Sequence, residues 1–170
     1  MKNDPDETIA VRFGTAGDLP ALTTLYNHYI TTTPITFDTE TYADREAWFA
    51  QFADTGPHQL WVATVADTPV GYASSTCFRP KAAYSTSVEV TVYCDEAHTG
   101  QGIGARLYSA LFAALETEDL HRAYAGITVP NEASEALHRR FGFEKVAFYH
   151  EVGRKFGRYW DVAWYEKRLA

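Results

Sequence analysis

The chain has 170 residues, of which 46% are hydrophobic and 22% are charged. This length and composition predict one soluble globular domain over residues 1–170, and they exclude a disordered chain and a pair of separate catalytic domains. Twenty-two acidic against fifteen basic side chains give a net charge of −7, which disfavours binding to the phosphate backbone of nucleic acids.

The N-terminus and the cysteines indicate the cellular compartment of the protein. Residues 1–7 are polar and predict a disordered tail, without the apolar core of a secretion signal. No apolar stretch approaches the roughly 20 residues that span a bilayer. The two cysteines, Cys77 and Cys94, are too few for the disulfide framework of a small secreted fold. We therefore expect a cytoplasmic protein without membrane contact.

The first half of the chain alternates between apolar periods typical of strands and of helices. In chain order we expect a strand at 8–13, a helix that begins after the N-cap Asp18, a helix at 44–52, and two strands at 60–66 and 70–78. The last two flank the short polar segment Asp67-Thr68-Pro69. They are therefore predicted to form an antiparallel hairpin.

The second half continues the alternation. We expect a strand at 88–94, a helix after the glycines of 100–104, a strand at 123–128, a short helix at 131–140 that stops at Gly142, and two strands at 143–152 and 160–169 around a loop at 153–157. In the strand at 88–94, Glu89, Thr91 and Tyr93 share one face because side chains alternate. The order of elements predicts an α+β (α/β layered) fold, with helices on a mixed sheet.

Aromatic residues make up 15% of the chain, which is more than one small core usually uses. They gather at Tyr26 and Tyr29 and again over 159–165. Such a surplus predicts a pocket lining or an oligomer interface in these two regions.

Three glycines within five residues stand between a predicted strand and a predicted helix, in Gly100-Gln101-Gly102-Ile103-Gly104. Backbone N–H groups at such a place can receive phosphate oxygens, so a cofactor with a pyrophosphate is the first hypothesis. A dinucleotide site would need an acidic residue after the next strand, where 128–131 reads Thr-Val-Pro-Asn. No Lys-Ser/Thr pair follows the glycines, which excludes a nucleoside-triphosphate loop. The alternative is a turn that only starts the helix.

Several segments in the same order resemble the acetyl-CoA-binding core of the GNAT superfamily of N-acetyltransferases. They are VYCD at 92–95, GQGIG at 100–104, NEASEALH at 131–138 and FGF at 141–143. Within that superfamily the chain resembles the phosphinothricin acetyltransferase group, through YNHY at 26–29, TFDT at 36–39, FRPKAAY at 78–84 and GRKFGR at 153–158. The resemblance covers about 11–169 and implies a central, mostly antiparallel sheet flanked by helices, acetyl-CoA as co-substrate, and a homodimer.

The resemblance also implies roles for particular residues. Glu89 is the expected general base, acting directly or through a water molecule, and His138 is the expected acid for the departing thiolate. The expected cofactor-binding residues are Val92, whose N–H is directed at the thioester carbonyl, with Tyr93, Cys94, Gly100, Gln101, Gly102, Ile103, Gly104 and Asn131. Thr99 stands where the superfamily usually has Gln or Arg, so the pyrophosphate is expected to rely more on backbone amides and on Gln101.

A small amino-acid substrate needs a cation for its carboxylate or phosphinate. Arg79 is the first choice because a guanidinium binds such groups in a bidentate manner, and Lys81 is the second. Phe37 and Tyr84 are expected to wall the pocket. The histidines and cysteines show no metal-ligand spacing, so no metal is expected.

The expected reaction is acetyl transfer from acetyl-CoA to the primary amine of a small amino-acid-like substrate of the phosphinothricin or methionine sulfoximine class, by direct attack. One alternative is a protein or peptide N-acetyltransferase, which would need an open cleft. The other is a CoA-binding module without catalysis. The residue types at Glu89 and His138 argue against the second alternative.

Overall fold

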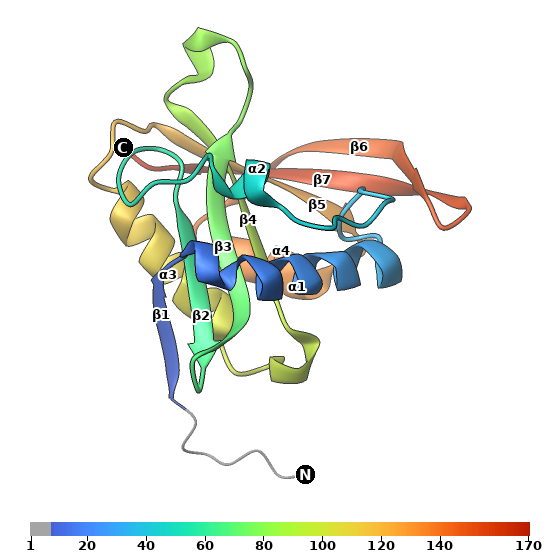
Figure 1. Ribbon diagram of the computed structural model, residues 1–170. Helices are drawn as coiled ribbons and strands as arrows, with labels where there is room; N and C mark the ends of the chain where they lie inside the picture. Colours follow the sequence, from blue (N-terminus) through green and yellow to red (C-terminus); the bar gives the residue numbers. More distant parts are fainter. Residues whose placement is uncertain (1–7) are drawn as a thin grey trace.

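The computed structural model describes residues 8–170, and the tail predicted for 1–7 lies outside this part of the chain. Its strands form one sheet in the order β1-β2-β3-β4-β5-β7-β6 (Figure 1). Their bounds are β1 Ile9–Phe13, β2 Leu60–Val65, β3 Thr68–Cys77, β4 Ser87–Cys94, β5 Arg122–Val129, β6 Glu144–Lys155 and β7 Arg158–Arg168. Neighbours are antiparallel except β4 and β5, which are parallel. The predicted mixed, mostly antiparallel sheet is confirmed.

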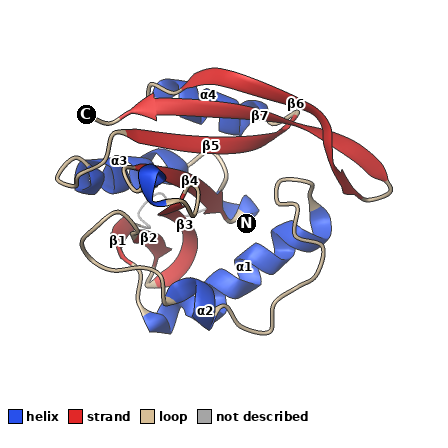
Figure 2. Ribbon diagram, turned by 90° about the horizontal axis from the view of Figure 1, so that it is seen from above, coloured by secondary structure: helices blue, strands red, loops and turns tan. Residues whose placement is uncertain are grey.

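Helices cover both faces of this sheet (Figure 2). They are α1 Leu19–Thr32, α2 Glu46–Phe49, α3 Ile103–Leu115 and α4 Glu132–Arg140. The buried face of α3 packs in the main core with Val88 and Val90 of β4. On the opposite face, Leu22 of α1 and residues around α2 pack with Tyr72 of β3. Each layer buries its apolar side against the sheet, which is what the predicted layered fold requires.

The predicted start of α1 after Asp18 is confirmed, but two details near α1 and α2 differ from expectation. The helix expected over 44–52 is only four residues long, because Ala53 N–H pairs with His58 O and turns the chain toward β2. Asp18 precedes α1 but its carboxylate does not cap this helix. Instead it accepts hydrogen bonds from Arg12 at 2.7 and 2.8 Å and from Thr15 N–H at 2.8 Å.

The C-terminal strands are longer than expected. The segment 153–157 was predicted as a loop, but β6 continues to Lys155 and β7 begins at Arg158. Only Phe156 and Gly157 form the turn, both with positive φ (53° and 72°). The resulting ribbon reaches past the other strands toward the C-terminal end of α1 (Figure 1).

The parallel strands β4 and β5 separate soon after they start. Their pairing covers Ser87 to Glu89 on β4 and Arg122 to Tyr124 on β5, and it ends there. Beyond Glu89 the two strands no longer pair with each other, so backbone groups along their inner edges become available for another partner. This opening lies in the middle of the sheet, directly beyond Glu89.

Candidate functional site

The predicted alternation along β4 is confirmed. Val88 and Val90 are buried in the main core, while Glu89, Thr91 and Tyr93 line a cavity of about 460 Å³ on the other face. The rest of the wall comes from the segment after α1, from β5 and from the C-terminal ribbon: Tyr26, Ile35, Thr36, Phe37, Gly126, Thr128, Tyr149, Val152, Val162 and Trp164. Within residues 8–170, Glu89 therefore contributes the one carboxylate in the wall of a largely aromatic and apolar cavity.

The surroundings of Glu89 change its acidity. Burial raises the pKa of this carboxyl above its ordinary value, because the charged form loses hydration, and the positive charge of Arg79 partly opposes the shift. A carboxylate with a raised pKa holds a proton more strongly than an exposed one. Glu89 is therefore suited to accept a proton from a substrate.

The predicted substrate residues are only partly brought together. Phe37 lines the Glu89 cavity, but Arg79, Lys81 and Tyr84 are exposed and are not part of its wall. The Arg79 guanidinium lies 4.6 Å from the ring centre of Phe78 and 5.9 Å from that of Trp164, which does line the cavity. Arg79 thus stands at the edge of the cavity.

The glycine-rich segment forms the expected turn before α3. Gly100 and Gly102 adopt φ angles of 82° and 74°, and a Cβ at either would meet open space. The first N–H groups of α3, from Ile103 onward, have no acceptor within their own helix. Gly104 has another role as well, because a Cβ there would lie 3.2 Å from Leu137 of α4. Its missing side chain allows the two helices to pack closely.

Where β4 and β5 separate, a narrow cavity of about 50 Å³ contains Val92, Tyr93, Asn131 and His138 in its wall. Asn131 caps α4, since its Oδ1 accepts a hydrogen bond from Ser134 N–H at 3.2 Å. Cys94 is at the end of β4, and burial raises its thiol pKa to about 11. The structure thus brings the opening of the sheet, the start of α4 and the glycine turn to one region.

His138 is almost completely buried, at 3% exposure. Its Nδ1 lies 2.7 Å from Ser134 O and its Nε2 lies 2.8 Å from Tyr108 Oη. Because a carbonyl only accepts hydrogen bonds, Nδ1 carries the proton and Nε2 accepts from the tyrosine. Burial lowers the pKa of the ring, so His138 is neutral near pH 7.

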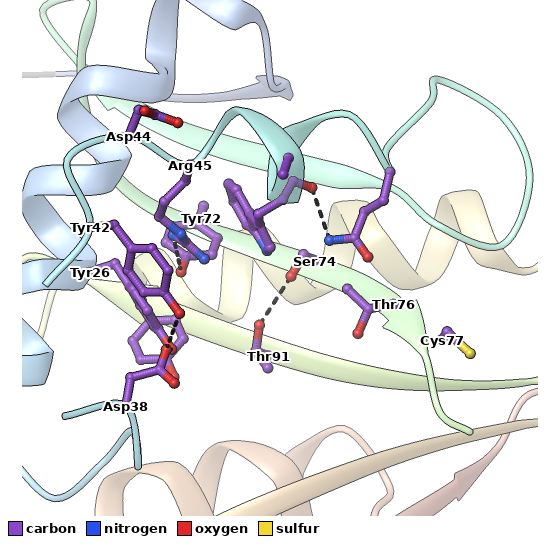
Figure 3. Close-up of a pocket in the computed structure, with 14 residues that line it drawn as sticks. Tyr26, Asp38, Tyr42, Asp44, Arg45, Tyr72, Ser74, Thr76, Cys77 and Thr91 are labelled. Atoms are coloured by element: carbon purple, nitrogen blue, oxygen red, sulfur yellow. Dashed lines mark hydrogen bonds between the residues drawn. The ribbon is translucent and has the colours of Figure 1, made fainter. Parts of the chain in front are cut away.

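A second cavity, of about 430 Å³, adjoins the first and was not predicted from the sequence (Figure 3). It lies between β3, β4 and the segment around α2, and Tyr26, Thr91 and Tyr93 border both cavities. Arg45 is buried in its wall. The aromatic surplus was a signal for Tyr26 and Trp164 as pocket residues, but no sequence pattern pointed to Arg45.

The structure shows what Tyr26 and Tyr29 do: Tyr26 lines a pocket, one of the two outcomes expected for this aromatic group, and Tyr29 is buried. Tyr29 is buried and donates a hydrogen bond to Cys94 O at 2.6 Å, so it offers little surface to a partner. Tyr26 donates to Asp38 Oδ2 at 2.7 Å and lines both cavities. Exposed aromatic and aliphatic side chains instead gather on the C-terminal ribbon: Val146, Phe148, Tyr149, Val152, Phe156 and Tyr159.

Two kinds of feature are absent from residues 8–170. No group of three or more His, Cys, Asp or Glu side chains is placed to hold a metal ion within this range. Over the same part of the chain, none of the helices combines the length and the apolar composition that crossing a membrane requires.

Comparison with known proteins gives a consistent result. Residues 22–143 match the acetyltransferase (GNAT) family. The chain is 57% identical to a phosphinothricin N-acetyltransferase of Streptomyces coelicolor, over 95% of this chain and 96% of that protein. It is 35% identical to an L-methionine sulfoximine/L-methionine sulfone acetyltransferase of Pseudomonas aeruginosa, over 94% of both.

Solved structures agree with these relatives. A GNAT superfamily phosphinothricin acetyltransferase of Sinorhizobium meliloti, in complex with acetyl-CoA, superposes with a TM-score of 0.89 and 28% identity, over 96% of this chain and 89% of that one. An N-acetyltransferase of Staphylococcus aureus gives the same TM-score and identity, over 96% and 99% of the two chains. The resemblance drawn from the sequence motifs is confirmed.

Proposed function

Since this chain belongs to the GNAT family of acetyltransferases, we propose that it moves the acetyl group of acetyl-CoA to the primary amine of a small amino-acid-like acceptor, with Glu89 as the general base. The observation that carries this proposal is the position of Glu89. It stands half-buried in the wall of a largely aromatic and apolar cavity, at the last residue where β4 and β5 still pair. An acceptor in this cavity has its amine beside a carboxylate whose pKa is raised.

The chemistry requires a neutral amine, because an ammonium has no lone pair with which to attack. Glu89 takes the proton, directly or through one water molecule, and the amine nitrogen then bonds to the thioester carbon. The new C–N bond leaves one proton too many on the nitrogen, and this proton is lost as the tetrahedral intermediate collapses and the C–S bond breaks. CoA leaves as a thiolate that takes up a proton. No covalent acyl-enzyme is needed.

Negative charge that develops on the thioester oxygen needs a donor. The backbone N–H of Val92 is proposed for this role, because Val92 lies beyond the point where the pairing between β4 and β5 ends. For the leaving thiolate we propose His138 as the acid. Its place beside Val92 in the narrow cavity supports this. The proton would come from the imidazolium form, which burial makes the minor form near pH 7.

Acetyl-CoA is the co-substrate, and the residues of this chain fit its polar half. Gly100, Gln101 and Gly102 form an open turn, and the N-terminus of α3 offers N–H groups and a positive dipole end to the pyrophosphate. Tyr93, Cys94 and Asn131 are proposed to border the pantetheine arm where the sheet opens. When bound, the cofactor supplies the activated acetyl group.

The acceptor class follows from the cavity and from the relatives. The Glu89 cavity has a volume of about 460 Å³ and a largely aromatic and apolar wall, which suits the side chain of one amino acid. The names of the relatives include phosphinothricin and methionine sulfoximine as substrates. We place the acceptor's α-carboxylate at Arg79, on the edge of the cavity, with Lys81 and Tyr84 on the same exposed loop and Phe37 as wall.

A thiol-release assay tests the proposal. Acetyl-CoA is offered with phosphinothricin, methionine sulfoximine, a lysine peptide and a polyamine. We expect the CoA thiol to be released faster with phosphinothricin and methionine sulfoximine than with the lysine peptide or the polyamine. Release only with the peptide would favour the peptide acetyltransferase, and binding of acetyl-CoA without release to any amine would identify a non-catalytic module.

We also propose that the enzyme is a cytoplasmic homodimer. The exposed apolar side chains of the β6–β7 ribbon support an interface, because surfaces of this kind are uncommon on monomers. The cytoplasm is supported by the free thiols of Cys77 and Cys94 and by the need for acetyl-CoA.

A further inference from the structure

No step of the proposed reaction uses the cavity around Arg45. It occupies the same face of the sheet as the Glu89 cavity, and Thr91 and Tyr93 of β4 form a wall common to both. Val92, which we assign to the thioester oxygen, lies between these two residues in the chain. An acceptor whose amine lies next to the thioester carbon therefore has the Glu89 cavity on one side and the Arg45 cavity on the other.

Arg45 is buried in an unusual way for a cation. Its side chain is only 7% exposed, and its guanidinium is sandwiched between the rings of Tyr26 and Trp48, at 4.0 and 3.7 Å from their centres. The stacking holds the planar group in one orientation. Figure 3 shows the guanidinium facing the same space as Ser74 and Thr91.

The charge of Arg45 is not matched by a carboxylate in contact with it. The one hydrogen bond of its guanidinium within residues 8–170 goes to Tyr72 Oη at 3.2 Å. Burial raises the pKa of Tyr72 to about 12, so this hydroxyl is neutral near pH 7. Within the same range no carboxylate oxygen approaches the guanidinium within 4.0 Å. A buried charge without a partner is costly, and a guanidinium has five N–H donors.

Asp38 also lines this cavity but is already engaged. Its Oδ2 accepts hydrogen bonds from Tyr26 at 2.7 Å and from Tyr42 at 3.1 Å. These hydroxyl groups hold the carboxylate at the rim of the cavity. The remaining donors of Arg45 are left for a group that enters from outside.

We infer that the Arg45 cavity is a subsite for a negatively charged oxygen group, such as a phosphinate, on the side chain of the acceptor. This inference rests on the proposed function. It adds Arg45 as the residue that favours acceptors with a negatively charged side chain. The planar fork of Arg45 binds two oxygens of one anion. Ser74 and Thr91 also line the cavity, and because their hydroxyls bond to each other, one of their two protons is left as a further donor.

The sheet connects this subsite with the catalytic carboxylate. Thr76 on β3 is paired with Glu89 on β4, and Ser74 is paired with Thr91, with their hydroxyl oxygens 3.0 Å apart. Paired strands are about 5 Å apart. Phosphinothricin carries its phosphinate two methylene groups from the α-carbon, so its side chain can pass from β4 toward β3 while the amine stays over β4.

The test compares two acceptors that share an α-amino acid backbone and differ in side-chain charge. Phosphinothricin carries an anionic phosphinate, and methionine sulfone carries a neutral sulfone. In Arg45→Met, kcat/KM for phosphinothricin should fall by about 10- to 100-fold, while the value for methionine sulfone and the KM for acetyl-CoA stay close to wild type. Arg140→Met, on an exposed arginine of α4, is the control and should change none of these.

Equal losses for both acceptors in Arg45→Met, or no loss for either, would overturn the inference. Failure of wild-type enzyme to acetylate either amino acid would instead refute the proposed function. A crystal structure of the wild-type enzyme with CoA and phosphinothricin decides the matter even if the variant does not fold. The phosphinate should lie against Arg45, and a phosphinate held by Arg79 or Lys81 would disprove the subsite.

Discussion

The Nζ of Lys155, at the end of β6, donates a hydrogen bond of 2.7 Å to Thr36 O in the segment between α1 and α2. Both residues are buried. The neighbouring Phe37 ring covers Gly153, where a Cβ atom would overlap it. The C-terminal ribbon therefore holds the segment that carries Phe37, one wall of the Glu89 cavity, and the GRKFGR motif gains a structural explanation.

Lys155→Met should weaken acceptor binding. The buried carbonyl of Thr36 loses its partner, at a cost of about 1–3 kcal/mol, and the Phe37 segment loosens. Steady-state kinetics should give a higher KM for the acceptor with an unchanged KM for acetyl-CoA. Lys145→Met is the control, because Lys145 is exposed on the same strand. A parallel rise in both KM values would show that the effect is not confined to the acceptor cavity.

Glu89→Gln keeps the shape of the side chain but removes the base. Turnover at neutral pH should fall by about 10²–10⁴, while acetyl-CoA binding measured by calorimetry stays the same. Glu144→Gln, at an exposed position of β6, should leave turnover unchanged. Near wild-type turnover in Glu89→Gln would remove Glu89 from the mechanism.

Arg79→Ala should change both the pH profile and the acceptor preference. Glu89 must be ionised to act, so kcat/KM falls as the pH drops through its pKa, which burial has raised. Arg79 opposes that rise, so its removal should move the acidic limb of the profile to higher pH. Amino-acid acceptors should also lose about 10- to 100-fold in kcat/KM, while an amine without a carboxylate is spared.

Two results with Arg79→Ala would contradict these predictions. If Arg79→Ala lowers kcat/KM for every amine equally, Arg79 does not bind the carboxylate. If the acidic limb stays in place, the charge of Arg79 does not reach Glu89. Arg79→Lys keeps the charge and should leave the limb near its original position.

Gly102→Val should raise the dissociation constant of acetyl-CoA, because a side chain at this turn stands where the pyrophosphate approaches the backbone. The positive φ of Gly102 also makes the variant strained. Gly56→Val is the matched control, since Gly56 has a φ of 91° and equally open surroundings in a remote loop. If both variants bind acetyl-CoA like wild type in calorimetry, the glycine turn only starts α3.

Light scattering tests the proposed dimer. At assay concentration the particle should have twice the mass of the chain. Val152→Asp, at a side chain 55% exposed on β6, should shift the equilibrium toward the monomer because a charge is costly in an apolar interface. A wild-type particle with the mass of one chain would reject the homodimer.

Local pattern in the sequence was enough for much of the fold and for the carboxylate that we propose as the general base. Side chains of a strand alternate, so the valines of 88–94 identified the buried face and placed Glu89 and Thr91 together on the other. The glycines before Ile103 marked the turn into α3 for an equally local reason, since few other residues adopt positive φ easily. The layers and the mixed, mostly antiparallel sheet followed from such elements and from the family resemblance, whereas the order of the strands came from the structure.

What only the tertiary structure decided are the contacts between segments far apart in the chain. Lys155 reaches Thr36, Arg45 is enclosed by Tyr26 and Trp48, and Trp164 lies over Gly126. Nothing near Arg45 in the sequence distinguishes it from an exposed cation, and the GRKFGR motif contains Lys155 without indicating that it is buried or what it contacts. Their burial depends on which remote segment covers them, and hydrophobic periodicity records only which face of an element is buried, not what packs against its polar residues.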